Sequence, residues 1–430
     1  MVRNNVQLGN EEETLRKTKP FVIPKELVFK AYKLVKAKAG AAGIDEQTLA
    51  DFDRDLKDNL YRLWNRLSSG SYFPPPVKAV SIPKKQGGER ILGVPTVTDR
   101  IAQMVVKMVL EPKVEPFFYP DSYGYRPNKS ALDAVGMTRQ RCWERNWVLE
   151  FDIKGLFDNI DHGLLMKAVK KHVSNKWIIL YIERWLKASM QLPDGSLAER
   201  DKGTPQGGVI SPVLSNLFLH YVFDAWISRH HPTLPWCRYA DDGLIHCGSE
   251  KEAQRILAEL KQRFEQCKLE LHATKTKIIY CKDGRRKGKY ETTEFTFLGY
   301  SFRRRLVKNS KRQSVFVNFT PAASPQSLKS MRAEIRKWRL RNRTNLKLNQ
   351  IASFVNPILR GWITYYGSYH RSGLSSVLRQ FNKILIAWAM RKYKRLKGHK
   401  TKAALFIGQI AQRQPQLFEH WKRGMTGAFA

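Results

Sequence analysis

Three aspartates on two separate segments are the residues of this chain whose types and spacing best suit chemistry. Asp241 and Asp242 end the tetrapeptide Tyr239-Ala240-Asp241-Asp242, which lies between an apolar run ending at Trp236 and the run 243–246. Adjacent carboxylates at a tight strand connection repel each other, so such a pair is usually compensated by a cation. Taken alone, an Asp-Asp pair is more often a solvated turn, because Asp is a common turn residue.

A third carboxylate favours a metal site over a plain turn. Residues 147–153 read as a mostly apolar, buried strand with Asp152 near its C-terminal end. Phosphoryl transfer with two metal ions needs carboxylates from separate segments, which hold the ions about 3.5 to 4 Å apart. Asp152, Asp241 and Asp242 have that composition, and we predict that they bind two Mg²⁺ ions.

The segment between these acids makes the interpretation more specific. Residues 203–208, Gly-Thr-Pro-Gln-Gly-Gly, lead into an apolar helix over residues 213–219. Glycine lets a backbone approach a base pair or a phosphate closely, although this segment alone is only a loop and a helix start. The order of strand acid, glycine-glutamine loop with helix, and Tyr-Ala-Asp-Asp hairpin resembles the palm of reverse transcriptases, and closely that of the group II intron type.

The resemblance extends over nearly the whole chain. It implies an α+β right-hand polymerase with an N-terminal extension and fingers over residues 1–140, a ferredoxin-like palm over 141–320, and an α-helical thumb or maturase domain over 321–430. Outside the palm motifs, the similar segments are 40–45 before the fingers, 82–100 and 122–127 in the fingers, 271–276 after the hairpin, and 297–302 as the primer grip. In the segment 271–276, His272-Ala273-Thr274 stands where relatives usually have Asn and acids.

The same resemblance assigns residues to roles. Those implied to contact the nucleotide are Lys84, Arg90, Ile153, Phe157, Gln206, Gly207 and Lys275. Those implied to contact template or primer are Tyr125, Arg126, Pro127, Gly299, Tyr300 and Arg360. Arg336, Arg339 and Lys394 are also expected to contact template or primer, because basic helices in series suit binding of a duplex by its backbone. Ile153 joins Asp152, Asp241 and Asp242 as a metal-binding position.

Two of these roles can be argued from the residues themselves. Lys84 and Arg90 flank a hairpin-like turn at 86–88, so two strands could project both cations toward a triphosphate, although a solvated basic loop is the simpler alternative. Phe157 lies five positions after Asp152. There, an aromatic ring under the sugar would leave no room for a 2′-hydroxyl and would favour deoxynucleotides. An ordinary core aromatic is the alternative for Phe157.

Two further acids are interpreted as structural. Asp161 shortly precedes the amphipathic run 164–169 and is expected to cap that helix, and Asp158 is expected to lie in a turn. We therefore predict that neither belongs to the site.

Composition points to a nucleic-acid partner without reference to any motif. The chain has 76 Lys and Arg against 38 Asp and Glu, a formal charge of +38. Such a surplus implies a polyanion as partner, bound with an affinity that falls with salt. A membrane-bound protein is disfavoured, because there is no apolar stretch long enough to span a bilayer and the N-terminus carries Glu11-Glu12-Glu13 in place of a signal pattern. We expect a cytoplasmic, nucleoid-associated protein of bacterial type.

Five cysteines without a C-x-x-C pair indicate reduced thiols, and their absence after Cys281 predicts that the chain lacks the cysteine-paired endonuclease domain of many group II intron proteins. The segment after Pro321 has only Glu334 and Glu419 as acids. Helices are predicted over 328–340 with Ser327 as cap, over 348–366 with a bend or break at Pro357, and over 381–393.

Residues 356–366 and 417–421 resemble the thumb or maturase domain, and the resemblance implies binding of the intron RNA and assistance in its splicing. The apolar stripes of these helices are equally explained as bundle core, with the cations facing outward.

We therefore predict an RNA-directed DNA polymerase that also assists splicing and mobility of an intron. Expected partners are RNA template and intron RNA, DNA primer or target and deoxynucleoside triphosphates; no membrane is expected, and the protein is a monomer or homodimer. Three alternatives remain open from the sequence: a splicing factor with an idle polymerase site, a relative recruited to a host task such as DNA repair or phage defence, and an RNA-dependent RNA polymerase, which Phe157 disfavours.

Overall fold

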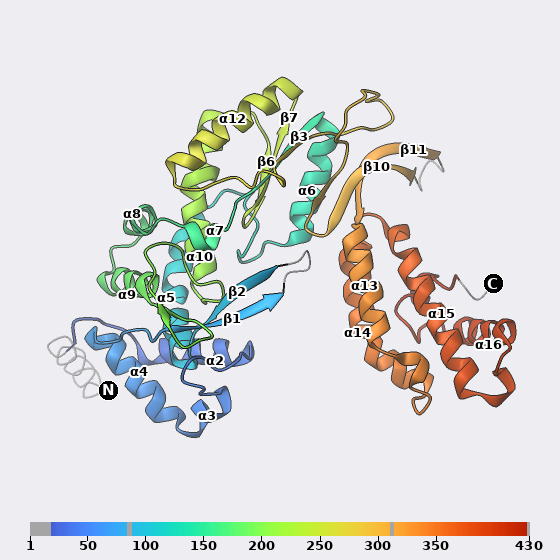
Figure 1. The fold of residues 1–430 in the computed structure, drawn as a ribbon, viewed down its shortest axis with the longest axis horizontal. Coiled ribbons are helices and arrows are strands. Elements are labelled where there is room, and N and C mark those ends of the chain that lie inside the picture. Colours follow the sequence, from blue (N-terminus) through green and yellow to red (C-terminus); the bar gives the residue numbers. More distant parts are fainter. Residues whose placement is uncertain (1–18, 84–87, 310–313, 428–430) are drawn as a thin grey trace, which may run out of the picture. The chain divides into compact units, whose positions relative to one another are not determined.

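The computed structural model describes residues 19–83, 88–309 and 314–427, and these form two compact units (Figure 1). The first comprises the described residues of 1–129, 151–243 and 255–276, and the second those of 130–150, 244–254 and 277–430. The chain therefore passes between the units several times, and the division falls within strands β3 (Trp147–Asp152) and β7 (Asp242–Cys247). The three-part division expected from the sequence stays a prediction.

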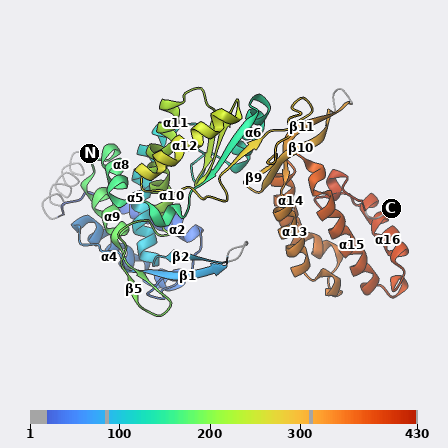
Figure 2. The same ribbon diagram turned by 45° about the horizontal axis from the view of Figure 1, so that its top comes forward.

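A hairpin of two strands projects from the first unit (Figures 1 and 2). Strand β1 (Val77–Pro83) pairs antiparallel with β2 (Glu89–Val94), with Pro83 opposite Glu89, so the predicted hairpin around the turn is confirmed. Lys84 and the turn itself lie outside the described residues. The short strands β4 (Met190–Gln191) and β5 (Leu197–Ala198) complete this sheet in the order β2-β1-β4-β5.

The four-stranded sheet that bears the acids has the order β6-β7-β3-β8. Its outer strands are β6 (Trp236–Tyr239) and β8 (Lys277–Tyr280), and β8 runs antiparallel to β3. Asp152 is the last residue of β3 and Asp242 the first of β7, so the carboxylates lie at strand ends. Phe151 packs against Phe223 with ring centroids 4.8 Å apart, which anchors the end of β3 in the core of the first unit.

Helices surround these strands in the first unit. Asp161 caps α8, because its carboxylate accepts a hydrogen bond from the amide of Leu164 at 2.8 Å, as predicted. Helix α10 continues through a π-helical turn, η2, into α11. The helices are α2 (Lys25–Ala37), α3 (Leu49–Arg54), α4 (Leu56–Ser69), α5 (Val97–Val114), η1 (Glu115–Phe117), α7 (Leu156–Asn159), α8 (His162–His172), α9 (Lys176–Lys187), α10 (Ser211–Leu219), η2 (His220–Asp224) and α11 (Ala225–His230), and α12 (Glu250–Gln266) begins in the second unit and ends in the first.

The second unit combines a three-stranded sheet with helices, α13 to α16 lying side by side in Figures 1 and 2. Buried apolar side chains of α13, α14 and α15, among them Ile335, Leu359 and Phe381, form its core. Its elements are α6 (Ala131–Glu144), β9 (Phe295–Phe297), β10 (Tyr300–Asn309), β11 (Ser314–Ala323), α13 (Pro325–Lys337), η3 (Leu340–Asn342), α14 (Leu348–Tyr366), η4 (Arg371–Leu374), α15 (Ser375–Lys392), η5 (Lys394–Leu396), α16 (Lys400–Arg413) and η6 (Trp421–Arg423).

Three sequence-based expectations for these helices need correction. Ser324, not Ser327, caps α13, because Pro325 occupies the first helical position, where its missing N–H costs nothing. Of the bend or break predicted at Pro357, only the break is contradicted, because helix α14 continues through this residue; its face with Val355 and Leu359 is buried in the core, and this packing offsets the lost hydrogen bond. Helix α15 begins at Ser375, ahead of the predicted start. Among the described residues, no helix is long and apolar enough to cross a membrane.

Candidate active site

The turn between β6 and β7 brings two carboxylates to the end of the acid-bearing sheet. Ala240, buried, has a φ of 56°, a left-handed conformation that is uncommon outside glycine and reverses the chain sharply. Burial raises the pKa of Asp241. Burial, the neighbouring Asp241 and the carboxylate of Asp152 raise the pKa of Asp242 to about 7. The three aspartates therefore lie within electrostatic reach of one another.

Asp152 already has a cation beside it. The ammonium of Lys275 lies 2.6 Å from Oδ2 of Asp152, and this hydrogen bond raises the pKa of the lysine. The segment of Lys275 is held there by backbone pairing, since His272 N donates to the carbonyl of Asp152 at 2.8 Å and Lys154 N donates to Glu270 O at 2.9 Å.

Between these two hydrogen bonds, Ile153 forms an antiparallel bridge with Leu271. Backbone groups alternate in direction along a strand, and the Asp152 carbonyl and Lys154 amide are directed at the partner. The carbonyl of Ile153 therefore points away from the Lys275 segment, as a metal-binding role would need.

The residues suit a divalent cation in chemistry. Among the described residues, no three His, Cys, Asp or Glu side chains are grouped closely enough to hold a metal ion as they stand. Asp241 and Asp242 nevertheless carry raised pKa values because they are buried beside another carboxylate, and added positive charge would relieve that repulsion. Carboxylate and carbonyl oxygens are the ligands that Mg²⁺ prefers.

The glycine-glutamine loop packs on the backbone that follows Asp152. The amide of Thr204 donates to the carbonyl of Phe157 at 2.7 Å, and that of Gly203 to Ile160 O at 2.7 Å. Gly207 has a φ of 124°, and a Cβ at that position would lie 2.5 Å from the carbonyl oxygen of Gly93. Only glycine permits this approach of the loop to strand β2.

The side chain of Gln206 joins the hairpin β1–β2 to the acid segment. Its Oε1 accepts a hydrogen bond from Nε of Arg90, and its Nε2 donates to the two carboxylate oxygens of Asp158 at 3.3 and 3.2 Å. Both ends of the amide are thus engaged, which fixes its orientation. Asp158, which we predicted to lie in a turn outside the site, lies in helix α7 and accepts these bonds from Gln206, one of the predicted nucleotide contacts. Its position directly after Phe157 was the available signal.

Of the residues predicted to contact the sugar or the template, Phe157 is buried, whereas Tyr125 and Pro127 are accessible. Phe157 is buried, which fits both a core aromatic and a ring under a sugar, so its role stays a prediction. Tyr125 is half exposed with a φ of 58°, and burial together with Asp241 raises its pKa, so its phenol lies near the turn. Pro127 is exposed.

Two predicted template contacts have side chains directed into the protein. Arg126, 6% exposed, donates Nε and Nη2 to Glu115 at 2.9 and 2.7 Å, and Nη1 to the carbonyls of Tyr119 and Ser122. Tyr300 is buried and its hydroxyl donates to the carbonyl of Tyr365. Neither side chain is open to a template in this structure, because its polar group already has partners inside its own unit.

The remaining predicted contacts lie in the second unit. Arg336, Arg339 and Lys394 are exposed. Arg360 forms an ion pair with Glu419 at 2.6 Å, which lowers the pKa of that carboxyl. Arg360 therefore helps to hold the C-terminal segment, although its side chain remains 61% exposed.

Gly299 has a φ of 79°, and a Cβ there would lie 3.0 Å from the Tyr366 hydroxyl, so its small size permits close packing of α14.

An acid-bearing strand and turn beside a glycine-glutamine loop define the palm of a template-directed polymerase. The reverse transcriptase (RNA-dependent DNA polymerase) family model matches residues 82–302, and the maturase-specific domain of group II introns matches residues 328–406. The chain belongs to the reverse transcriptase family. The two matches define an RNA-directed DNA polymerase of the group II intron type, joined to a domain of the kind that assists intron splicing and mobility, and they confirm the predicted α+β right-hand polymerase fold.

Individual relatives agree with this family. Protein YkfC from Escherichia coli (strain K12) is 32% identical over 67% of this chain and 82% of its own length. Group II intron-encoded protein LtrA from Lactococcus lactis subsp. cremoris is 26% identical over 83% of this chain and 71% of its own length. Among solved structures, telomerase from Candida albicans with a fragment of telomeric RNA aligns with a TM-score of 0.45 and 13% identity, over 88% of this chain and 68% of that one.

Proposed function

We propose that the site extends a DNA primer on an RNA template, with Asp152, Asp241 and Asp242 as its catalytic carboxylates. The observation that carries this proposal is that β3, which ends at Asp152, lies next to β7, which begins at Asp242; burial, Asp241 and Asp152 accordingly raise the pKa of Asp242. These acids are far apart in sequence, and the neighbouring strands β3 and β7 bring them within electrostatic reach of one another. The family requires a divalent metal, and these residues supply oxygen ligands from two segments.

The proposed metal ligands are the three carboxylates and the carbonyl of Ile153. Two Mg²⁺ ions, when bound, supply positive charge that stabilises the attacking 3′-oxygen and the leaving pyrophosphate. The chain's own contribution is to hold these oxygens at fixed strand ends. Lys275, which now pairs with Asp152, is exposed enough to turn toward a triphosphate instead.

The incoming deoxynucleoside triphosphate is proposed to contact the β1–β2 hairpin and the glycine-glutamine loop. Arg90, with Lys84, would bind the triphosphate through charge-assisted hydrogen bonds. Gln206 and Gly207 would line the pocket, with the amide of Gln206 oriented by Arg90 and Asp158. Phe157 would exclude the 2′-hydroxyl of a ribonucleotide.

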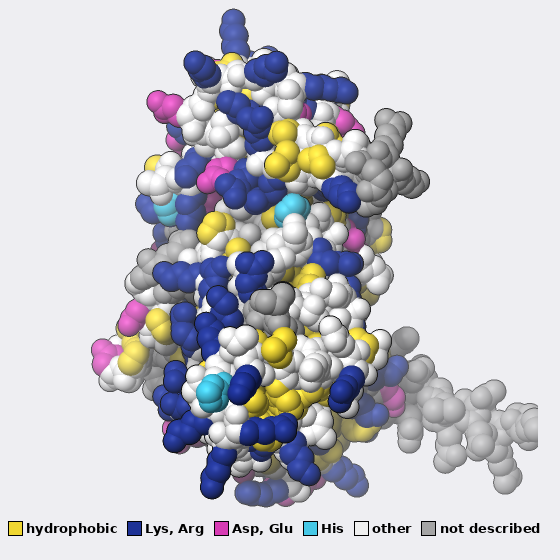
Figure 3. Space-filling view, turned by 90° about the vertical axis from the view of Figure 1, so that its right-hand side faces the viewer, with side chains coloured by type: hydrophobic (Ala, Val, Ile, Leu, Met, Phe, Trp, Pro, Cys, Tyr) yellow, Lys and Arg dark blue, Asp and Glu magenta, His cyan; other side chains and the backbone are white. Residues whose placement is uncertain are grey.

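The second unit is proposed to bind the template-primer duplex and the intron RNA. Lys and Arg side chains spread over the face that includes α15 and α16, with few acidic ones among them (Figure 3). Exposed Arg336, Arg339 and Lys394 would contact the phosphate backbone, which positions a duplex without reading its sequence. We further propose that the protein acts as a monomer or homodimer.

Primer extension with purified full-length protein tests the proposal. An RNA template with an annealed DNA primer is supplied with deoxynucleotides or ribonucleotides and Mg²⁺, and Asp241→Ala serves as the inactive control. We expect DNA synthesis by the native chain, little use of ribonucleotides, and loss of synthesis in the control. Synthesis that persists in the variant, or equal use of both nucleotide types, would contradict the assigned residues.

A further inference from the structure

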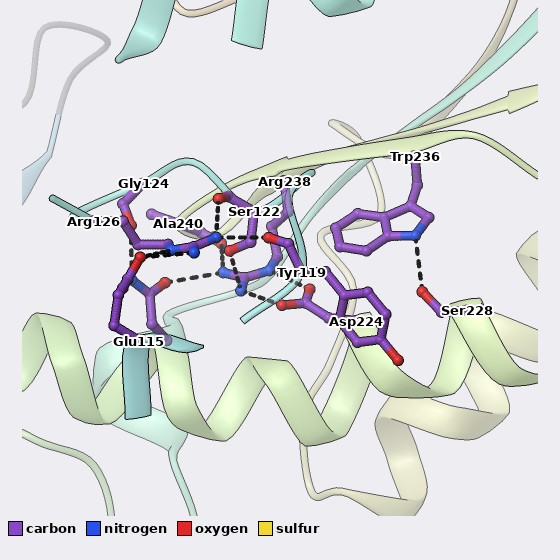
Figure 4. Close-up of polar contacts among 11 residues, drawn as sticks. Glu115, Tyr119, Ser122, Gly124, Arg126, Asp224, Ser228, Trp236, Arg238 and Ala240 are labelled. Carbon is purple, nitrogen blue, oxygen red and sulfur yellow. Dashed lines mark hydrogen bonds and ion pairs between the residues drawn. The ribbon is translucent and has the colours of Figure 1, made fainter. Parts of the chain in front are cut away.

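A buried guanidinium lies directly behind the turn that carries the two adjacent aspartates (Figure 4). The side chains of Arg238 and Asp224 are both 0% exposed, and Nε and Nη2 of the arginine donate to the two carboxylate oxygens at 2.7 Å each. Nη1 donates to Asn216 Oδ1 at 3.1 Å and to the carbonyl of Ala240 at 3.2 Å, and Nη2 also donates to Ser122 Oγ at 2.8 Å. All five N–H groups of Arg238 therefore have acceptors.

Stability alone is a weak reason for such an arrangement. The desolvation penalty of burying an ion pair offsets much of the Coulomb attraction between its charges. Apolar side chains of similar volume often stabilise a fold equally well. Lysine, with three donors and no planar fork, could not reproduce the five bonds. What distinguishes this ion pair is that one of its bonds ends on the backbone of the turn between β6 and β7.

The turn needs support at that point. Ala240 adopts a left-handed φ of 56° without being glycine, and its carbonyl accepts from Arg238. On another side, Gly124 lies so close that a Cβ there would be 2.4 Å from the amide nitrogen of Ala240. The carbonyl of Gly124 is in turn held by Asn216 Nδ2 at 2.7 Å, so the same cluster confines the turn from two directions.

The acceptors come from elements far apart in the sequence. Asn216 belongs to α10, and Asp224 ends the π-helical turn η2 that follows it, a type of turn found often at functional sites. The backbone of Arg238 pairs with the segment before α6, because its amide donates to Asp121 O at 3.0 Å and its carbonyl accepts from Tyr123 N at 2.8 Å. The guanidinium of Arg238 thus donates hydrogen bonds to α10 and η2, to the segment before α6 and to the β6–β7 turn.

We infer that Arg238 is a positioning residue that, paired with Asp224, holds Ala240 in its left-handed conformation and so fixes the directions of the carboxylates of Asp241 and Asp242. The inference rests on the proposed function, since it assigns a supporting role behind that same site. Loss of the guanidinium would let the turn relax, and the two carboxylates would then bind metal less well while the nucleotide pocket, formed by other segments, stays intact.

Arg238→Lys tests this role, because it keeps the charge but removes the fork. Primer extension gives kcat and KM for a deoxynucleotide, and electron paramagnetic resonance measures binding of Mn²⁺ to the protein without nucleic acid. We expect kcat to fall about tenfold or more with KM within about twofold, because the loss affects the turn and not the pocket. Binding of Mn²⁺ should weaken about fivefold in parallel.

A matched control separates positioning from general destabilisation. Arg184, partly buried in the same unit, donates to the carbonyls of Gly70 and Tyr72 at 2.7 and 2.5 Å. Arg184→Lys should lower the unfolding temperature to a comparable extent and leave kcat and Mn²⁺ binding unchanged. If Arg238→Lys fails to fold, Ser122→Ala removes a single bond to the guanidinium and should lower kcat about two- to threefold with the ion pair intact.

A rescue experiment decides the inference. Glycine enters the left-handed region without the penalty that alanine has, so Ala240→Gly in the Arg238→Lys background should restore kcat by about threefold or more. Wild-type kcat and Mn²⁺ binding in Arg238→Lys, or no rescue by Ala240→Gly, would overturn the inference. A native chain that binds Mn²⁺ but makes no DNA would contradict the proposed function instead, and the Mn²⁺ measurements would still test the positioning role.

Discussion

Arg238 of the first unit and three cations of the second unit use positive charge in opposite ways. In the first unit, Arg238 is fully buried and each of its N–H groups has one acceptor at a fixed distance. In the second, Arg336, Arg339 and Lys394 are exposed to solvent. A buried donor with fixed partners holds one local geometry, so we expect its substitution to impair the one function that depends on that geometry. Exposed cations are screened by salt and can replace one another, so each single substitution should lower affinity only slightly. The following predictions test this contrast.

The largest effect is expected from the acids. Asp152→Asn removes one proposed metal ligand and leaves Lys275 without its ion-pair partner. We expect kcat in primer extension to fall on the order of 10³-fold with little change in duplex affinity, because the binding surfaces remain. Retained activity with normal Mg²⁺ dependence would remove Asp152 from the site.

Stability should respond to pH through Asp242. Its pKa is raised to about 7, above its ordinary value. Without divalent metal, the neutral acid therefore adds to the free energy of unfolding at low pH, and this contribution is lost as pH rises through about 7. Asp242→Asn should therefore become more stable than the native chain by up to about 4 kcal/mol between pH 4 and pH 8, measured by chemical denaturation in EDTA. Added Mg²⁺ should bind the native protein and stabilise it, and so reduce the difference in unfolding free energy between the two proteins. Parallel stability curves for the two proteins would contradict the prediction.

A smaller effect is expected from Asp158, which orients Gln206. Asp158→Ala leaves one end of the glutamine amide without its acceptor. We expect KM for deoxynucleotides to rise about three- to tenfold and kcat to change less. Asp194→Ala provides the control, since that exposed acid accepts hydrogen bonds from nearby Ser196 in a turn of the same unit. Equal effects of the two substitutions would show that Asp158 has no special role.

The smallest effect is expected from single cations of the second unit. Arg336→Gln or Lys394→Gln should weaken RNA binding about two- to threefold and reduce the slope of log affinity against log salt by about one, because each removes one phosphate contact. Filter binding over a range of salt concentrations measures both quantities. A single substitution that abolished binding would show that these cations act as fixed, specific contacts, as in the first unit.

The fold class was predicted from the resemblance to a known family, and several single elements were predicted well because their signals are local. The helix cap at Asp161, the β1–β2 hairpin and the buried strand ending at Asp152 each follow from adjacent residues, and the structure contains all three. Prediction from the sequence was less accurate for the bounds and caps of the helices in the second unit. There, tertiary burial carries α14 through Pro357, which propensity alone would not indicate.

The candidate site shows the same limit. The resemblance of residues 122–127 to a fingers segment implied that Arg126 contacts the template, yet its guanidinium is bound to Glu115 inside the protein. Asp158 looked like a turn residue, yet it meets a glutamine 48 positions away. Periodicity and spacing report how the backbone runs, but they do not report which distant partner a polar side chain will meet.

By itself, the sequence determined the family and the surplus of positive charge, and it named the three acids as the candidate site, since these depend on residue identity and order. The tertiary structure alone decided that Lys275 pairs with Asp152, that the amide of Gln206 is held at both ends, and that a buried guanidinium supports the turn at Ala240. The physical reason is that a charged or polar group takes its pKa, orientation and partners from neighbours that folding brings from elsewhere in the chain.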